Sequence, residues 1–415
     1  MTEQEIVALG PAFAAELRGY RECFGQERVA IHFATYCRGL LTDLPRKTVE
    51  PIALAAGTAV RTLQEFLTTT NWDHSAARDR VHRRMAAAVA TVPAGDLGTV
   101  GVIDETSAVK KGDKTPGVQR QYLGCVGKID NGIVTVHVGL ARGTFQALLD
   151  ADLYLPRSWA ADRARCQAAG IPDTVRYRAK WRIAFDQLLR LHANGVRFDW
   201  LVFDEGYGSK GPFLWLVGRI GQRFVAEVPV NFAVRDQPGG TSRRADVAQP
   251  GTGTGIWERH PITRKTQATQ VWRAREVRVW AARGWHRLIT AVNEATGEVK
   301  YFLTNATDEP LSQVLAVGFR RATIEHAFRL AKQEAGLMHY EGREYVGLIR
   351  HLTLSLIVLG FVATHTERLR GKKSGRHRRA SVPGVERPDR SGGPASARNP
   401  DPPPHERRDP VSSAA

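Results

Sequence analysis

Two short apolar runs, TVGVID at residues 99–104 and WLVFD at residues 200–204, decide the fold of this 415-residue chain. Both are rich in β-branched and aromatic residues and too short for a typical helix, so we expect two buried strands. Each run ends in an aspartate, Asp104 or Asp204, and a glutamate follows directly. A strand-end cap would explain either aspartate alone, but the two runs together predict a pair of carboxylates at one edge of a sheet.

A third stretch, RRATIEHAFRLAK at residues 320–332, has the spacing of an amphipathic helix. Its apolar stripe consists of Ile324, Phe328 and Ala331. A second row places Glu325 between two cations, Arg321 and Lys332. Such a row suits a carboxylate that stays ionised near phosphates, although an exposed helix face with i, i+4 ion pairs has the same pattern.

The segments around these stretches predict an α/β, ribonuclease H-like core. Strands are expected at residues 121–128, 133–140 and 224–228, and a helix at residues 177–193. The sequence Asp130-Asn131-Gly132 predicts the turn of a hairpin between the first two of these strands. In such a layout the ends of the first and fourth strands meet, and a helix after the fifth strand can bring a third carboxylate beside them.

Residues 1–92 carry helical patterns, which we interpret as an N-terminal DNA-binding region. Within residues 51–69 the pattern is a helix, a turn at Gly57 and a second helix, as in a helix-turn-helix. Arg61 and Gln64 lie on the exposed side of the second helix. A plain helical hairpin without DNA contacts gives the same pattern and stays an alternative.

The catalytic core is expected to comprise residues 93–228 and 306–366, interrupted by a β-rich insertion at residues 229–305. Four of the nine tryptophans lie in this insertion: Trp257, Trp272, Trp280 and Trp285. Core packing explains most of them, and Trp285 is our candidate for stacking on an unpaired base. Residues 367–415 shift to Arg, Pro, Ser and Gly, which predicts a disordered basic tail.

The net charge of +17 predicts a polyanionic partner and says nothing about the fold. No N-terminal stretch resembles a signal peptide. The apolar stretch at residues 348–364 contains Arg350 and His351, which favours a buried core helix over a membrane span. The four cysteines lack metal-ligand spacing and suit a reducing cytoplasm, so we expect a cytoplasmic, nucleoid-associated protein without a membrane partner.

With these residues in view, the chain resembles a DDE transposase of a bacterial insertion sequence. The matching motifs are Val102-Ile-Asp104-Glu105-Thr106, Lys110-Lys111-Gly112, Phe203-Asp204-Glu205-Gly206-Tyr207-Gly208 and Ile324-Glu325. Arg321, Glu325 and Lys332 also match the Arg-x3-Glu-x6-Lys part of a signature known in one large transposase group. Gly318 stands where that signature has a tyrosine. The resemblance spans residues 40–365 and leaves out the tail.

The resemblance implies a two-metal site with Mg²⁺, for which Mn²⁺ can substitute, because two hard cations can activate a nucleophile and stabilise a leaving oxygen. We assign Asp104 to both ions, Asp204 to one and Glu325 to the other. The residues expected to contact DNA are Arg321, Lys332, Lys110, Lys111, Arg61, Gln64 and Trp285. Glu105 and Glu205 are rival ligands, but alternation along a strand points each of them away from the aspartate before it.

The expected function is metal-dependent cleavage of DNA at the ends of an insertion element, followed by strand transfer. Its partners would be double-stranded DNA, as terminal inverted repeats and target, and further copies of the chain in a homodimer or higher oligomer. A catalytically inactive, transposase-derived DNA-binding protein or repressor is the alternative. A glycosidase using Asp104 and Glu325 fits the basic charge poorly.

Overall fold

The computed structural model describes residues 9–248, 256–262, 269–322, 328, 331 and 334–379. The chain divides into two units, Met1–Arg370 and Gly371–Ala415. Two predicted site residues, Glu325 and Lys332, lie outside the described residues. Disorder was predicted for residues 367–415; residues 367–379 are helical instead, and residues 380–415 lie outside the described residues.

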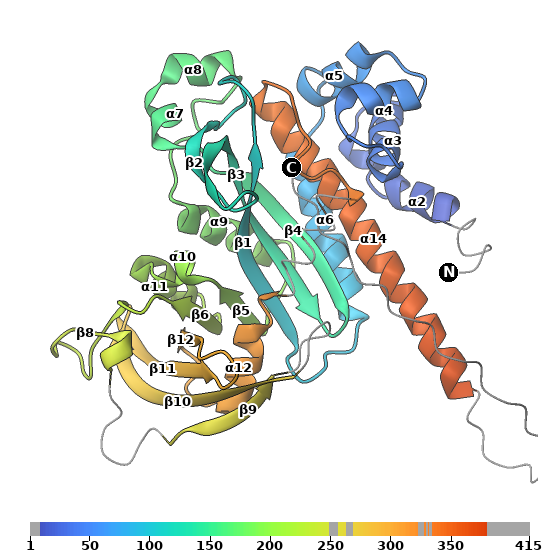
Figure 1. Cartoon of the computed structure of the whole chain (residues 1–415). Helices are drawn as coiled ribbons and strands as arrows, with labels where there is room; N and C mark the ends of the chain where they lie inside the picture. The colour runs from blue at the N-terminus through green and yellow to red at the C-terminus, as the bar shows by residue number, and fades with distance from the viewer. Residues whose placement is uncertain are drawn as a thin grey trace, which may run out of the picture. The chain divides into compact units, whose positions relative to one another are not determined.

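The first unit is built on a large mixed sheet (Figure 1). Among the described residues its order is β2 (Gln119–Leu123), β3 (Lys128–Arg142), β1 (Thr99–Val109), β5 (Trp200–Phe203), β6 (Phe224–Val228), β12 (Val299–Thr304), β11 (Gly284–Asn293), β10 (Gln270–Ala281) and β9 (Glu258–Ile262). A further strand, β4 (Phe145–Leu153), pairs with β3, and β7 (Ala233–Val234) pairs with β8 (Arg243–Arg244) in a small separate sheet. Strand β5 runs parallel to β1 and β6, and the other pairs in the large sheet are antiparallel. The strands of residues 258–304 therefore continue the same sheet.

The strand prediction was wrong in two places. The turn lies between β2 and β3 at residues 124–127, where Gly127 takes a φ of 65°, and the Asp130-Asn131-Gly132 sequence is inside β3. The Asn131 side chain donates to the backbone oxygens of Lys110 and Gly112, which stabilises this part of the ladder. Strand β4 was missed, because its sequence FQALLDADL contains two aspartates.

Five α-helices make up most of the N-terminal region: α2 (Leu9–Arg18), α3 (Glu27–Leu41), α4 (Val49–Ala55), α5 (Val60–Thr68) and α6 (His74–Ala90). The predicted helix pair corresponds to α4 and α5, and Gly57 between them has a φ of 61°. Leu63, Phe66 and Leu67 bury one face of α5. This leaves Arg61 and Gln64 exposed on the opposite face, as predicted.

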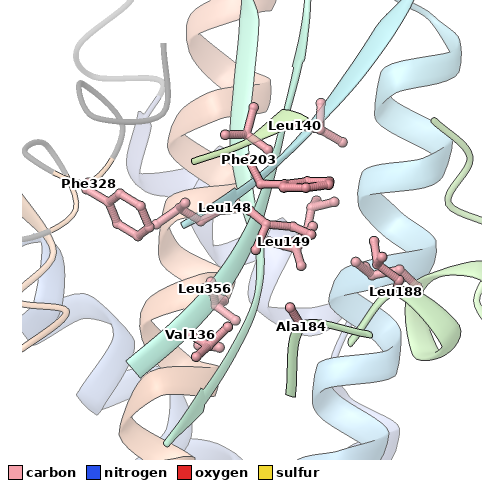
Figure 2. Close-up of a cluster of buried hydrophobic side chains, with 14 of the residues drawn as sticks. Val136, Leu140, Leu148, Leu149, Ala184, Leu188, Phe203, Phe328 and Leu356 are labelled. Carbon is pink, nitrogen blue, oxygen red and sulfur yellow. The ribbon is translucent and has the colours of Figure 1, made fainter. Parts of the chain in front are cut away.

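Among the described residues, further α-helices are α7 (Arg157–Ala161), α8 (Arg163–Ala168), α9 (Lys180–Ala193), α10 (Glu205–Gly208), α11 (Gly211–Arg219), α12 (Leu311–Phe319) and α14 (Tyr345–Arg379). Helix α14 is long and apolar enough to cross a membrane, but 78% of its most apolar window is buried inside the protein. It therefore serves as the core helix predicted at residues 348–364. Figure 2 shows Leu356 of α14 in one cluster with Leu148 of β4 and Leu188 of α9, and all three are buried.

A network of buried charges joins α6 to β4 and α9. Arg190 on α9 donates to Asp150 at 2.8 Å and to Asp152 at 2.6 Å, and Asp150 is fully buried. Arg78 on α6 lies 3.8 Å from Asp152, and His82 on the same helix lies 3.5 Å from Asp150. Because buried carboxylates are costly without cations, these ion pairs explain how β4 can carry two aspartates inside the protein.

A second buried contact connects α14 to the N-terminal helices. The His351 ring is fully buried, and its Nδ1 lies 2.9 Å from the Tyr36 hydroxyl on α3. Its Nε2 lies 3.0 Å from the Gly336 carbonyl oxygen. A carbonyl can only accept, so Nε2 carries the proton and the neutral Nδ1 accepts from Tyr36. Burial lowers the pKa of His351 to about 4.

The neutral His351 makes stability depend on pH. Its pKa falls from 6.5 to about 4 on folding, so the unfolded chain binds the extra proton between these values. We expect the free energy of unfolding to decrease from pH 6.5 to pH 4, by up to roughly 3 kcal/mol from this residue. Urea unfolding across this range should show a shallower pH dependence for His351→Gln than for the wild type. Equal pH dependence in the two proteins would contradict the assignment.

Candidate active site

The two predicted aspartates lie on neighbouring strands at the same edge. The parallel ladder of β1 and β5 ends at the pair Ile103 and Phe203. Asp104 and Asp204 are the next residues on their chains, so both carboxylates follow the last rung of one ladder. Strand β1 itself continues to Val109 in its antiparallel pairing with β3. The pairing with β5 therefore stops just before Asp104, but the strand does not.

The position of the Asp204 side chain is fixed by the short helix that follows it. The Asp204 side chain caps the N-terminus of α10 and accepts a bond from the backbone nitrogen of Tyr207. Gly208, at the end of this short helix, approaches β6 so closely that a Cβ would collide with the carbonyl oxygen of Glu227. The Glu205-Gly206-Tyr207-Gly208 sequence thus brings α10 against the sheet and holds Asp204 beside Asp104.

The Asp104 carboxylate is in an unusual electrostatic setting. Its pKa is raised to about 7, chiefly by burial and also by the nearby charge of Asp204, while the Arg321 guanidinium opposes this rise. Arg321 Nη1 lies 3.3 Å from Asp104 Oδ2, and the backbone nitrogen of Glu105 donates to Asp104 Oδ1 at 2.8 Å.

A third carboxylate, Glu227, lies at the same edge and was not predicted. On β6, Ala226 pairs with Phe203 of β5, so Glu227 follows the ladder as Asp204 does. Glu227 accepts from Lys300 Nζ of β12 at 2.5 Å and lies 3.9 Å from Arg321 Nε. Arg321 therefore lies between Asp104 and Glu227. Sequence alone gave no signal for Glu227, because only the strand register reveals its neighbours.

A cavity of about 620 Å³ opens at Asp104. Its lining includes Asp104, Glu105, Tyr122, Cys125, Arg321 and Phe328. Glu105 pairs with Lys180 of α9 at 2.6 Å. The rival Glu105 therefore lines the same cavity as Asp104 but has a different cation, so strand alternation does not remove it from the site.

The Tyr207 side chain is a further neighbour that sequence reasoning did not single out. It is buried, and burial together with the charges of Glu105, Asp104 and Asp204 raises its pKa well above the usual value. Its hydroxyl has no hydrogen-bond partner among the described residues. A buried hydroxyl beside three acidic side chains is a suitable acceptor for a water bound to a cation.

Two of the described carboxylates have the chemistry of ligands for a divalent metal ion. Asp104 and Asp204 offer the hard oxygen ligands that Mg²⁺ prefers, and the unpartnered Tyr207 hydroxyl suits a hydrated ion. Within the described ranges no group of three His, Cys, Asp or Glu side chains converges on one point. Glu325, the third predicted ligand, lies outside those ranges.

The other predicted contact residues are distributed over distant parts of the first unit. Lys110, at the end of β1, donates through Nζ to the carbonyl oxygens of Met338 and Tyr340, whereas Lys111 is exposed. Arg61 forms an exposed ion pair with Glu65 at 2.8 Å.

Trp285 is at the start of β11 and does not line the cavity. Its ring lies 5.6 Å from that of Trp280, and the Arg278 guanidinium lies 4.3 Å from its centre. The adjoining two-residue turn, Ala282 and Arg283, has φ values of 45° and 62°. Positive φ at two non-glycine residues is strained, and such strain tends to occur at functional positions.

Comparison with known proteins agrees with this arrangement. A family model described as DDE superfamily endonuclease matches residues 20–291, more than half of the chain. A probable transposase for insertion sequence element IS701 from Microchaete diplosiphon is 32% identical over 223 residues, which are 53% of this chain and 54% of that protein. The chain thus spans about half the length of the curated relative that it matches.

The raised pKa of Asp104 predicts how a substitution changes stability. Its folded value of about 7 lies above the ordinary 3.8, so the ionised carboxylate destabilises the fold above pH 7, and this effect is lost as pH falls to 4. Without metal, Asp104→Asn should raise the free energy of unfolding at pH 8 by up to roughly 4 kcal/mol and change it little at pH 4. Urea unfolding checks this, with the exposed Glu205→Gln as the control. Equal effects of Asp104→Asn at both pH values would contradict it.

Proposed function

The chain belongs to the DDE superfamily of endonucleases, and from this premise we propose that it cuts DNA at the ends of an insertion element and transfers them to target DNA. One observation carries the proposal: Asp104 and Asp204 follow the last rung of the same parallel ladder. Because phosphodiester cleavage by two metal ions needs clustered carboxylates, this pair forms the core of the site. The net charge of +17 suits a DNA substrate.

Strand topology supports a ribonuclease H-like catalytic core. The path β4-β3-β1-β5-β6 gives the order 3-2-1-4-5 when these strands are numbered along the chain. The second strand is antiparallel to the first and to the third, and the last two are parallel to the first. We assign residues 93–228 and 306–366 to this core, residues 229–305 to an insertion, residues 1–92 to a DNA-binding region and residues 367–415 to a tail.

We assign roles to the chain's own residues from their surroundings. Asp104, Asp204 and Glu325 would hold two Mg²⁺ ions, which supply an activated nucleophile and stabilise the leaving oxygen. Arg321, held between Asp104 and Glu227, is placed to exchange a carboxylate for a phosphate of the bound strand. Lys332 is assigned the same task on sequence grounds alone. The Tyr207 hydroxyl would accept from a bound water and help to orient it.

Recognition of the element's ends is assigned to the N-terminal helices. Arg61 and Gln64 are exposed on α5, where they could reach base edges. Arg61 would first have to break its ion pair with Glu65. Lys111 would contact a phosphate, and assembly as a homodimer or higher oligomer would bring two ends together. A repressor that binds DNA without cutting it remains the second candidate, favoured if the site fails to bind metal.

The central test is substitution of the three carboxylates. Asp104→Asn, Asp204→Asn and Glu325→Gln each keep the size of the side chain and remove anionic oxygen. Each should lower Mg²⁺-dependent nicking of a terminal-repeat duplex by about three orders of magnitude or more, and combined losses should be far from additive. DNA binding in a gel-shift assay should survive, because affinity rests on dispersed Lys and Arg side chains.

Three further variants calibrate this experiment. Lys332→Ala should be milder than the carboxylate variants, since a lysine contributes no metal ligand. Glu205→Gln is the matched control, because Glu205 is exposed on α10. Glu105→Gln tests the rival in the cavity. Substantial nicking by any of the three carboxylate variants would show that the residue is not part of the site. If Glu105→Gln abolishes nicking and Asp104→Asn does not, Glu105 is the metal ligand in place of Asp104.

Trp285 provides a separate prediction. If its ring stacks on a base unpaired at the cut end, Trp285→Ala should slow cleavage of intact duplex ends by about tenfold, because stacking on a base contributes about 1–3 kcal/mol. Cleavage of ends that are already unpaired should change less. Trp257→Ala is the control, since Trp257 is 38% and Trp285 36% exposed. Equal losses on both substrates would assign Trp285 to packing against Trp280.

A further inference from the structure

A short segment, residues 334–340, directly follows the stretch that contains Glu325. Ala331 and Glu334 are helical positions, and Gly336 has a φ of 58°, which the left-handed region allows to glycine. The helical conformation ends here. The last carbonyl groups of a helix have no partner within it, so they need donors from elsewhere.

The first donor is Lys47, in the loop between α3 and α4. Its Nζ donates to the carbonyl oxygen of Glu334 at 2.7 Å and to those of Leu40 and Thr42 at 2.8 Å each. These three bonds use all three donors of the ammonium group, and the residue is only 5% exposed. A cation at the C-terminal end of a helix is also favoured by the helix dipole.

Two more donors reach the same segment from other elements. His351 of α14 donates from Nε2 to the carbonyl oxygen of Gly336 at 3.0 Å. Lys110, at the end of β1, donates from Nζ to Met338 at 3.3 Å and also to Tyr340. Lys47, Lys110 and His351, which we call the carbonyl clamp, come from three distant parts of the sequence and converge on seven consecutive residues.

We propose that the carbonyl clamp is a positioning device for the third carboxylate, and that Lys110 acts as a positioning residue for catalysis. The inference rests on the proposed role of Glu325, nine residues before Glu334. Strand β1 carries Asp104 and ends at Val109, and Lys110 is the next residue. The first carboxylate and an anchor of residues 334–340 are therefore six residues apart on one stretch of chain. The clamp thus fixes residues 334–340 to the end of the strand that carries Asp104.

The competing role for Lys110 is direct contact with a DNA phosphate, as the sequence suggested. Its ammonium is bound to two carbonyl oxygens, and burial lowers its pKa to about 8. Engaging a phosphate would break these bonds and leave the carbonyl groups without their donor. The exposed neighbour Lys111 can reach solvent phosphates without that loss. The two adjacent lysines therefore have separable roles.

The test compares Lys110→Gln with Lys111→Gln in the full-length chain. Hydrogen exchange followed by mass spectrometry reports on amides of residues 334–340, and the salt dependence of binding to a terminal-repeat duplex reports on phosphate contacts. Lys110→Gln should speed exchange in residues 334–340 and leave the salt slope unchanged. It should also slow single-turnover cleavage at saturating DNA by about 100-fold, as expected for a small misplacement of a catalytic group.

Lys111→Gln should give the reverse pattern, with wild-type exchange in residues 334–340 and a salt slope reduced by about 0.9 for one lost phosphate contact. Lys110→Arg keeps a cation with several donors and should restore most of the cleavage rate. If Lys110→Gln fails to fold, Lys110→Arg still tests the proposal through its exchange in residues 334–340 and its cleavage rate. The proposal is overturned if Lys110→Gln flattens the salt slope while exchange stays at the wild-type rate. Nicking by Glu325→Gln would instead refute the proposed function and leave the exchange result standing.

Discussion

The burial of Asp104 beside a second carboxylate is the constraint on which the candidate site depends. An ionised group is costly inside a protein, and a like charge next to it adds to the cost. The fold offsets this with one guanidinium, that of Arg321, at 3.3 Å. In the proposed function, this unfavourable burial keeps two oxygen ligands in place before a cation binds.

This constraint extends through the sheet. Arg321 lies between Asp104 on β1 and Glu227 on β6, and Glu227 in turn accepts from Lys300 on β12. Positive and negative side chains therefore alternate from Lys300 on β12 through Glu227 and Arg321 to Asp104. Because β12 pairs directly with β6, those strands are part of the framework that holds Arg321.

Basic residues in this protein serve two purposes that composition cannot separate. The basic face of α6 is largely paired within the protein, since Arg78 lies near Asp152, Arg80 bonds Glu22 and Arg84 bonds Glu16. Lys47 and Lys110 likewise donate to backbone carbonyl groups. The excess of positive charge available to DNA must therefore come from other residues, among them exposed ones such as Lys111.

The sequence by itself determined the two strands whose parallel pairing stops just before Asp104 and Asp204, the helical pair around Gly57 and the buried helix at residues 348–364. These features depend on local patterns, namely apolar runs, spacing and a single glycine, which a short stretch of chain fixes alone. The family resemblance rested on the same local motifs. Even there, the turn assigned to residues 130–132 was wrong, because a side-chain contact of Asn131 with a distant loop favours the strand.

Only the tertiary structure decided which charged residues belong together. Lys110 meets Met338 and Tyr340 across 228 and 230 residues of chain, and Glu227 joins the site through strand register alone. Strand β4 could be buried with Asp150 and Asp152 because Arg190 on α9 reaches both. Such ion pairs and hydrogen bonds form between segments far apart in sequence, so no local pattern encodes them and only the folded chain brings the partners within reach.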